Sequence, residues 1–243
     1  MVITSTDNDR IKGYIKLKER KNRKKSNEFL VEGTHLVLEA CKKGIVKEII
    51  LEEDASFITD LPIVYVSKEI MKKLSEMDTP SNVMAVCNML DNKISGEKFL
   101  LLDDIQDPGN LGTIIRSAMA FNVDTIVLSP NTVDLYNPKV VRATQGMMFH
   151  INIVINDLKE VIEELKSRDI PIYGTRVDSG SDVRLLRDEK TDRYALIMGN
   201  EGNGVSTDIL DMCDEYLYIK MNDKVESLNV GVATSIILYE LNK

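Results

Sequence analysis

Cysteine and histidine are scarce in this 243-residue sequence. Its three cysteines, Cys41, Cys87 and Cys213, are far apart and lack Cys-x-x-Cys spacing, so the sequence suggests neither a disulfide framework nor a zinc site. His35 and His150 are its only histidines and are equally poor metal candidates. We therefore expect no metal in this protein.

Long apolar runs are also missing. None approaches the roughly 20 residues of a membrane span, and the N-terminal stretch MVITSTDNDR lacks the apolar part of a signal peptide. We expect a cytoplasmic protein that does not enter a membrane. Hydrophobic residues still make up 43% of the chain, enough for a sizeable core, and the length favours two domains.

Positive charge is in deficit overall but concentrated in one segment. The net charge of -8 argues weakly against a nucleic-acid ligand. Between residues 10 and 25, however, nine of sixteen residues are Lys or Arg and one is Glu, so this segment carries +8 and the remainder -16. One interpretation is a solvated amphipathic helix with Ile11, Tyr14, Ile15 and Leu17 facing inward. The other is a surface that binds phosphates along a nucleic acid.

The first part of the chain has the pattern of a small α/β domain. Strands are predicted at 28–33, 47–53, 62–67 and 82–89, and helices at 34–44 and 68–77. The polar stretch LDNKISGEK follows and has no apolar periodicity, which is typical of a linker. We place the first domain at 1–90, the linker at 91–97 and a second domain at 98–243.

The second domain alternates strands and helices regularly. Short apolar runs predict strands at 99–105, 124–129, 151–155, 171–175, 194–199 and 215–220, with helices at 110–121, 138–146, 158–168, 207–213 and 227–241. This order predicts a parallel sheet covered by helices, in which ligands bind beyond the carboxyl ends of the strands. The candidate loops are DDIQDPGN, GNEGNG and KMNDKVES, which begin at residues 103, 199 and 220.

Each loop has a structural and a functional interpretation. Asn110 can cap the following helix, and Arg116, opposite the apolar face of that helix, is either solvated or functional. The glycines of GNEGNG either form a turn or let a ligand approach the backbone. Ser227 is a good N-cap for the last helix, whereas the amide of Asn229 must find partners or face a cavity.

Together, in this order and spacing, the motifs resemble the SpoU/TrmH group of SPOUT RNA 2'-O-ribose methyltransferases. The resemblance lies in LDDIQDPGNLGTIIRSAMAF, LIMGNEGNGVS and YIKMNDKVESLNVGVATSIILYE, in that order along the chain. The N-terminal stretch FLVEGTHLVLEACKKG resembles the L30e-like substrate-binding domain that many members carry.

The resemblance implies an α/β fold whose parallel sheet ends in a trefoil knot, S-adenosylmethionine as cofactor, and a homodimer with its active site near the subunit interface. It implies that the cofactor-binding residues are Gly199, Ile219, Met221 and Leu228. It implies that the catalytic residues are Arg116, Asn110, Glu201, Ser227 and Asn229.

Arg116 is the proposed base in this family. A guanidinium stays protonated in proteins, so we instead expect Arg116 to bind the neighbouring phosphate, position the ribose and stabilise the developing alkoxide. Glu201 or a substrate phosphate would then accept the proton.

The third motif departs from the family pattern, which commonly has Ile-Pro-Met followed shortly by glycine. Here Lys220 replaces the proline, and Asp223 stands where a glycine is usual, so the loop should be less constrained. Asn122 similarly replaces a common glycine and tolerates a left-handed backbone.

The L30e-like domain favours 23S ribosomal RNA as the substrate, because members with this domain mostly act on ribosomal RNA. Transfer RNA is the alternative, and a non-catalytic RNA-binding protein that retains the fold is the rival from another class. On the phosphate-binding interpretation of the basic segment, its RNA contacts are Lys21, Arg23, Lys24 and Lys25.

Overall fold

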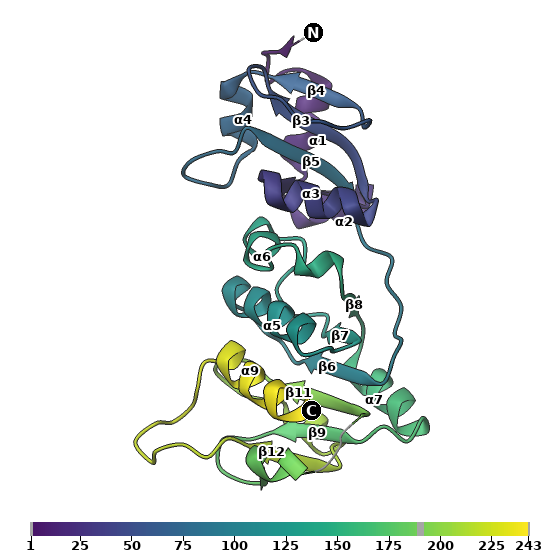
Figure 1. The fold of residues 1–243 in the computed structure, drawn as a ribbon, viewed down its shortest axis with the longest axis vertical. Coiled ribbons are helices and arrows are strands. Elements are labelled where there is room, and N and C mark those ends of the chain that lie inside the picture. Colours follow the sequence, from purple (N-terminus) through teal and green to yellow (C-terminus); the bar gives the residue numbers. More distant parts are fainter. Residues whose placement is uncertain (1, 189–191, 243) are drawn as a thin grey trace. The chain divides into compact units, whose positions relative to one another are not determined.

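The computed structural model describes residues 2–188 and 192–242, and the chain divides into two compact units (Figure 1). Unit 1 runs to Asp91 and also includes Asp134–Phe149. Unit 2 comprises Asn92–Val133 and the chain from His150 onward. No helix in the described ranges is long and apolar enough to cross a membrane.

The described part of unit 1 contains a five-stranded mixed sheet in the order β1-β4-β3-β5-β2. Its strands are β1 (Val2–Ile3), β2 (Glu28–Glu32), β3 (Val46–Glu52), β4 (Ile63–Val66) and β5 (Val83–Asn88). Its helices are α1 (Asp9–Lys16), α2 (Arg20–Ser26), α3 (Thr34–Lys43), α4 (Lys68–Leu74) and α6 (Pro138–Ala143). The elements predicted between residues 28 and 89 are confirmed, whereas the two-residue strand β1 was too short to predict.

The basic segment forms two helices, not the single amphipathic helix of the first interpretation. The chain turns between α1 and α2, at residues 17–19. Ile11, Tyr14 and Leu17 are buried against the sheet as predicted, and Ile15 packs at the edge of the same cluster. The apolar spacing therefore identified the buried face correctly but carried no signal for the turn.

Arg23 is buried, which corrects its prediction as an RNA contact. Only 3% of the residue is exposed, and its guanidinium forms an ion pair with Asp134. The same guanidinium donates hydrogen bonds to the carbonyl oxygens of Leu17 and Lys18 at 2.8 and 2.7 Å, which holds the turn before α2. The charge of Arg23 is thus used inside unit 1, whereas Lys21, Lys24 and Lys25 are exposed.

The segment Asp134–Phe149 lies in unit 1, although the predicted boundaries of 98–243 place it in the second domain. Beyond the Arg23 ion pair, the ring of Tyr136 packs on Phe29 with 4.7 Å between centroids. The hydroxyl of Tyr136 accepts a hydrogen bond from the backbone N–H of Leu90 at 2.9 Å. Composition along the chain cannot reveal such contacts, because the paired residues are far apart in sequence.

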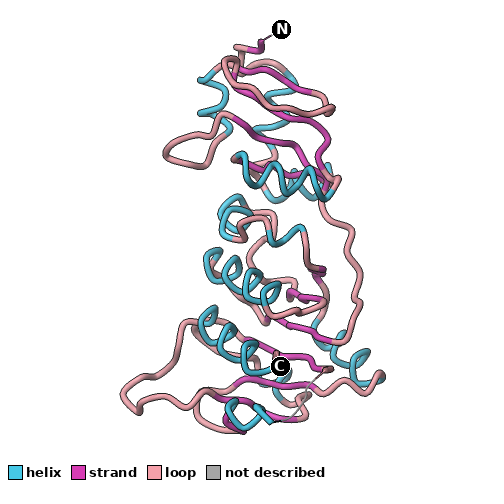
Figure 2. Tube along the Cα trace, in the orientation of Figure 1, coloured by secondary structure: helices cyan, strands magenta, loops and turns pink. Residues whose placement is uncertain are grey.

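Unit 2 contains a seven-stranded sheet in its described part, in the order β10-β12-β9-β11-β6-β7-β8, and every pairing is parallel. Its strands are β6 (Lys98–Leu102), β7 (Thr125–Leu128), β8 (Asn152–Ile155), β9 (Ile172–Thr175), β10 (Ser181–Asp182), β11 (Tyr194–Met198) and β12 (Glu215–Tyr218). Its helices are α5 (Pro108–Ala120), α7 (Leu158–Ser167), α8 (Thr207–Leu210) and α9 (Val230–Leu241). The predicted parallel α/β sheet is confirmed (Figure 2).

Helices cover both faces of this sheet. Phe99 and Leu101 of β6 pack in a buried cluster with residues of α7 and α8. Leu100 and Leu102 are also fully buried and, because side chains alternate along a strand, face the opposite side. Helices α5 and α9 lie side by side, joined by a 2.7 Å hydrogen bond between their serine hydroxyls (Figure 1). Burial on both faces explains why β6 is a continuous apolar run.

We predict that Arg23→Ala destabilises unit 1 by about 3 kcal/mol, because removal of one member of a buried ion pair leaves the other charge uncompensated. The matched control is Lys24→Ala on the exposed face of the same helix, which should cost at most about 0.5 kcal/mol. Urea titration measures the free energy of unfolding of both variants, and amide hydrogen exchange in β2 reports on unit 1. Equal stability of the two variants would contradict the structural role of Arg23.

Candidate active site

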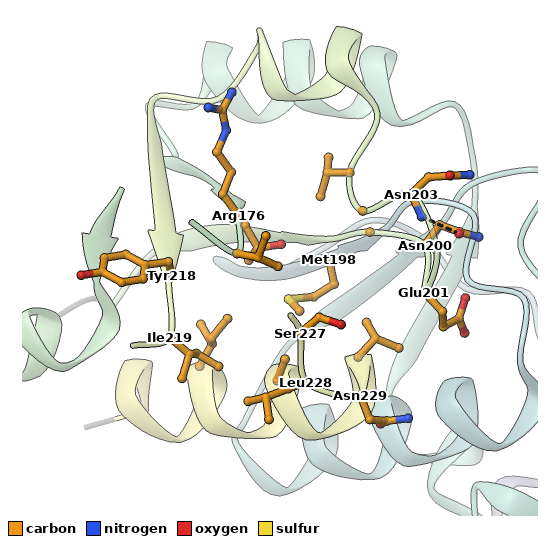
Figure 3. Close-up of a pocket in the computed structure, with 18 of the residues that line it drawn as sticks. Arg176, Met198, Asn200, Glu201, Asn203, Tyr218, Ile219, Ser227, Leu228 and Asn229 are labelled. Carbon is orange, nitrogen blue, oxygen red and sulfur yellow. Dashed lines mark hydrogen bonds between the residues drawn. The ribbon is translucent and has the colours of Figure 1, made fainter. Parts of the chain in front are cut away.

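A cavity of about 740 Å³ lies at the carboxyl ends of β9, β11 and β12 (Figure 3). It brings together eight of the nine predicted catalytic and cofactor-binding residues. These eight are Asn110, Gly199, Glu201, Ile219, Met221, Ser227, Leu228 and Asn229. Arg116, the ninth, does not line this cavity in the described structure.

The loop after β11 is held by its own hydrogen bonds. The side-chain oxygen of Asn200 accepts from the N–H groups of Gly202 and Asn203 at 2.8 and 3.2 Å, the second of which is drawn in Figure 3. A Cβ atom on Gly199 would lie 2.1 Å from the carbonyl carbon of Gly204. Glycine is therefore required at 199 because the backbone of the same loop returns against it, and the loop is fixed before any ligand binds.

The residues that cap helices α5 and α9 differ from the predicted ones. The cap of α5 is Asp107, whose carboxylate accepts from the Asn110 N–H at 2.7 Å, so the prediction of Asn110 as cap was wrong. The cap of α9 is Asn229, which accepts from two backbone N–H groups at 3.0 and 3.2 Å, so Ser227 is not the cap. The side chains of Asn110 and Ser227 are therefore not used for capping, and both residues line the cavity.

A chain of hydrogen bonds joins the three motifs. The amide nitrogen of Asn229 donates to the side-chain oxygen of Asn110 at 2.8 Å, and the amide nitrogen of Asn110 donates to Glu201 at 3.0 Å. The same carboxylate accepts from the backbone N–H groups of Gln106 and Asp107 at 3.2 and 3.1 Å. The amide of Asn110 consequently has one defined orientation and one N–H left for a ligand.

These bonds determine the protonation of Glu201. Partial burial acts to raise the pKa of its carboxyl, but the hydrogen bonds from the Asn110 side chain and from backbone N–H groups outweigh it, and the pKa lies below the ordinary value of 4.5. Donors to the charged form stabilise that form. Glu201 is therefore a carboxylate at neutral pH and a weak base.

Arg116 is exposed on α5, and among the described residues it has no hydrogen-bond or ion-pair partner. A guanidinium with no internal partner keeps all of its donors available to a ligand. Arg116 points outward because the opposite face of the same helix is buried. That face is formed by Leu111, Ile114, Ile115 and Ala118.

One wall of the cavity was missed by the sequence analysis. It is lined by Thr175, the last residue of β9, and by the residues that follow, Arg176, Val177 and Asp178. The guanidinium of Arg176 lies 4.1 Å from the ring centroid of Tyr216. The available signal was the position of this stretch at the carboxyl end of another parallel strand. The sheet order, with β9 between β12 and β11, makes its end part of the same site.

The lining suits S-adenosylmethionine. The volume falls in the range of roughly 300–1,000 Å³ that small-molecule pockets span. Met198, Leu217, Ile219 and Leu228 give an apolar wall, and the carboxylate-bearing residues Asp178 and Glu226 suit a cationic ligand. Ile219 and Leu228 lie beside α9 in Figure 3, where they would flank the ligand.

Two family models and a characterised relative match this chain. Residues 97–239 match the SpoU rRNA Methylase family, and residues 8–85 match the MRM3-like substrate binding domain. The chain is 40% identical, over 98% of each chain, to the 23S rRNA (guanosine(2553)-2'-O)-methyltransferase RlmP of Bacillus subtilis (strain 168).

Two solved structures define the likeness in three dimensions. The SpoU methyltransferase AviRb from Streptomyces viridochromogenes, in complex with the cofactor AdoMet, has a TM-score of 0.86 at 26% identity and covers 96% of this chain and 97% of its own. The A. aeolicus TrmH/SpoU tRNA modifying enzyme has a TM-score of 0.52 at 26% identity and covers 62% of this chain and 76% of its own.

We predict that the Glu201 carboxyl titrates below pH 4.5 in carbon-detected NMR, and that Asn110→Ala raises its midpoint because the side-chain donor is lost. A lowered pKa means that the carboxylate stabilises the fold fully above about pH 4.5, and that this contribution is lost as pH falls through the lower, folded-state value. Asn203→Ala, in the same loop but not bonded to Glu201, should leave the midpoint unchanged. A wild-type midpoint at or above 4.5 would refute the assignment.

Proposed function

Since this chain belongs to the SpoU rRNA methylase family and is an S-adenosylmethionine-dependent RNA 2'-O-ribose methyltransferase, we propose that it acts in the cytoplasm on 23S ribosomal RNA, at the guanosine that the Bacillus subtilis relative modifies. The observation that carries the proposal is 40% identity over both domains of a relative with that activity. Transfer RNA is disfavoured, because the tRNA-modifying structure covers only 62% of this chain.

Gly199, Ile219, Met221 and Leu228 hold the cofactor in this proposal, with Ser227 and Asn229 beside them. When bound, the cofactor supplies a methyl group made electrophilic by a positively charged sulfur. The apolar wall excludes water from that group, and the preformed loop after β11 presents backbone donors and acceptors to the polar parts of the ligand.

Methyl transfer forms a bond from the ribose 2'-oxygen to the methyl carbon, breaks the bond from that carbon to sulfur, and releases the hydroxyl proton. The protein must therefore align the hydroxyl and help it lose the proton. We assign the alignment to the remaining N–H of Asn110 and to Arg116, which binds a substrate phosphate with its planar fork and stabilises the developing alkoxide. The guanidinium remains protonated throughout.

Glu201 takes a positioning role in this proposal. Its carboxylate already accepts hydrogen bonds from Asn110 and from two backbone N–H groups, and its pKa is lowered. These three hydrogen bonds occupy most of the acceptor positions of the carboxylate, which leaves it little room to take the proton from the ribose hydroxyl. Of the two acceptors that the sequence left open, we therefore favour the substrate phosphate.

We predict that 23S ribosomal RNA from cells without this gene lacks one guanosine 2'-O-methyl mark, and that Arg116→Lys restores it no better than Arg116→Ala. Lysine cannot reproduce the planar fork, so both variants should lower turnover by roughly 100-fold or more. Mapping of 2'-O-methyl sites and single-turnover assays measure these effects.

Calorimetric titration is the control, because both Arg116 variants should bind S-adenosylmethionine normally. Near-normal turnover of Arg116→Lys would contradict the phosphate-fork role. An unchanged pattern of marks in ribosomal RNA, with a mark lost from transfer RNA instead, would contradict the proposed substrate. Absence of any methylation would favour the non-catalytic RNA-binding protein.

The exposed lysines of α2 are the proposed contacts to RNA phosphates. We predict that joint replacement of Lys21, Lys24 and Lys25 by Gln weakens RNA binding and flattens its salt dependence, because each lost phosphate contact removes about 0.7 to 0.9 from the log-log slope. Filter binding of one ribosomal RNA fragment at several salt concentrations measures the slope. Cofactor affinity should not change.

The matched control removes the same charge from α4, where Lys68, Lys72 and Lys73 are also exposed on unit 1. This triple variant should retain the wild-type slope if phosphate binding belongs to α2. Equal effects of the two triple variants would mean that the charges of α2 only solvate the helix.

A homodimer through α5 and α9 is also proposed. These neighbouring helices expose Met119, Val232 and Tyr239 at 37%, 47% and 58%, which leaves apolar surface suited to a second copy. Val232→Glu should give monomers in sedimentation at micromolar concentration, while the control Ile155→Glu, at the exposed end of the edge strand β8, should stay dimeric. A monomeric wild type would refute the dimer. The trefoil knot, which the resemblance to the SpoU/TrmH group implies, also remains a proposal. Tracing the chain in a crystal structure tests it.

A further inference from the structure

The loop that follows β6 contains a left-handed residue. Asp104 has a φ of 57°, in the region that glycine adopts freely and that is unfavourable for a residue with a side chain. Two and three residues further on, the backbone N–H groups of Gln106 and Asp107 donate to the carboxylate of Glu201. The direction in which the chain leaves β6 therefore decides whether those donors reach Glu201.

Hydrogen bonds with Ser129, the residue after β7, hold Asp104 in this conformation. The backbone N–H of Asp104 donates to the Oγ atom of Ser129 at 2.9 Å, and the same hydroxyl donates to Oδ1 of Asp104 at 2.6 Å. Ser129 is buried, and its backbone N–H donates to the carbonyl oxygen of Leu102 at 3.0 Å, which continues the pairing of β6 and β7. The sheet thus fixes the hydroxyl that offsets the cost of the left-handed backbone.

The carbonyl group of Asp104 connects this turn to the loop after β11. Its oxygen accepts from Nδ2 of Asn200 at 2.8 Å and from Nε2 of Gln106 at 3.0 Å. Asn200 directly precedes Glu201 and also holds its own loop through its side-chain oxygen. The loops after β6 and β11 are therefore bonded to each other through two consecutive residues, Asn200 and Glu201.

We propose that Asp104 and Ser129 are positioning residues for methyl transfer, whose mutual hydrogen bonds maintain the turn that sets the start of α5 against Glu201. Neither residue lines the cavity in the described structure, so each acts through the loop that it holds. This role rests on the proposed function, in which Asn110 aligns the ribose hydroxyl and Glu201 orients Asn110. Ser129 lies outside all three motifs.

Single-turnover methylation of ribosomal RNA by the full chain tests the proposal. Asp104→Ala keeps the Cβ atom but loses the carboxylate, and should lower the rate about tenfold, because an unsupported left-handed residue shifts the turn toward other conformations by about that factor. Asp104→Gly should recover most of the rate, since glycine adopts this backbone without a partner. Affinity for S-adenosylmethionine in calorimetric titration should stay close to that of the wild type, because bonds between Asn200 and Gly204 hold the cofactor loop.

Asp169→Ala is the matched control. Asp169 has the same φ of 57°, but it is exposed after α7 and does not line the cavity. Its replacement makes a left-handed backbone unfavourable to a comparable degree, yet should leave the rate of methyl transfer at the wild-type level.

Titration of the Glu201 carboxyl by carbon-detected NMR distinguishes positioning from a general loss of stability. Hydrogen bonds from the backbone of Gln106 and Asp107 contribute to the lowered pKa of Glu201. Asp104→Ala should therefore raise the midpoint toward the ordinary value of 4.5, whereas Asp104→Gly and Asp169→Ala should leave it unchanged. Ser129→Ala removes the same bonds from the other side and should match Asp104→Ala in rate and midpoint.

Equal losses of rate in Asp104→Ala and Asp104→Gly would overturn the proposal, and so would an unchanged Glu201 midpoint in Asp104→Ala. A similar loss of rate in Asp169→Ala would also overturn it. If Asp104→Ala does not fold, Ser129→Ala decides alone, and wild-type rate and midpoint in that variant would overturn the proposal.

The proposed substrate fails separately. Methylation by the wild type of an RNA other than 23S ribosomal RNA would contradict the proposed function, and the same variants compared on that RNA would still decide the role of Asp104. Methylation of 23S ribosomal RNA at the wild-type rate by Asp104→Ala and Ser129→Ala would overturn this inference alone.

Discussion

The carboxylate of Glu201 connects two of the three motifs around the cavity directly and the third through Asn110. It binds the backbone just before α5 and the amide of Asn110, which in turn is bonded to Asn229 at the start of α9. A charged acceptor forms stronger hydrogen bonds than a neutral one, so the Glu201 carboxylate holds the three loops in fixed positions relative to one another. The arrangement favours alignment of a substrate over abstraction of its proton.

The parallel sheet makes that connection possible. The carboxyl ends of β6, β9, β11 and β12 share one edge, so loops from distant parts of the sequence meet there. Their conformations are set before a ligand arrives, by the Asp107 and Asn229 caps and by the turn that Asn200 holds. The loop after β12 differs because its middle is exposed.

Unit 1 divides its positive charge between two uses. Arg23 is buried with Asp134 and fixes both the turn before α2 and the segment Asp134–Phe149. Lys21 and Lys24, on the same helix, are exposed. A count of basic residues treats these side chains alike, although a buried guanidinium with a carboxylate partner has no charge to offer a nucleic acid.

The sequence alone determined the strands and helices between residues 28 and 89, the parallel order of the second domain, and eight residues of the cavity, because apolar periodicity and loop motifs are local properties. The structure was needed to show that Asp107 caps α5 and Asn229 caps α9, that Arg23 is buried, and that the wall after β9 completes the cavity. It also decided that Glu201 is stabilised as a carboxylate. Apart from the caps, which are local, these features bring together residues that are distant in the sequence, and no pattern of neighbouring residues records such distances.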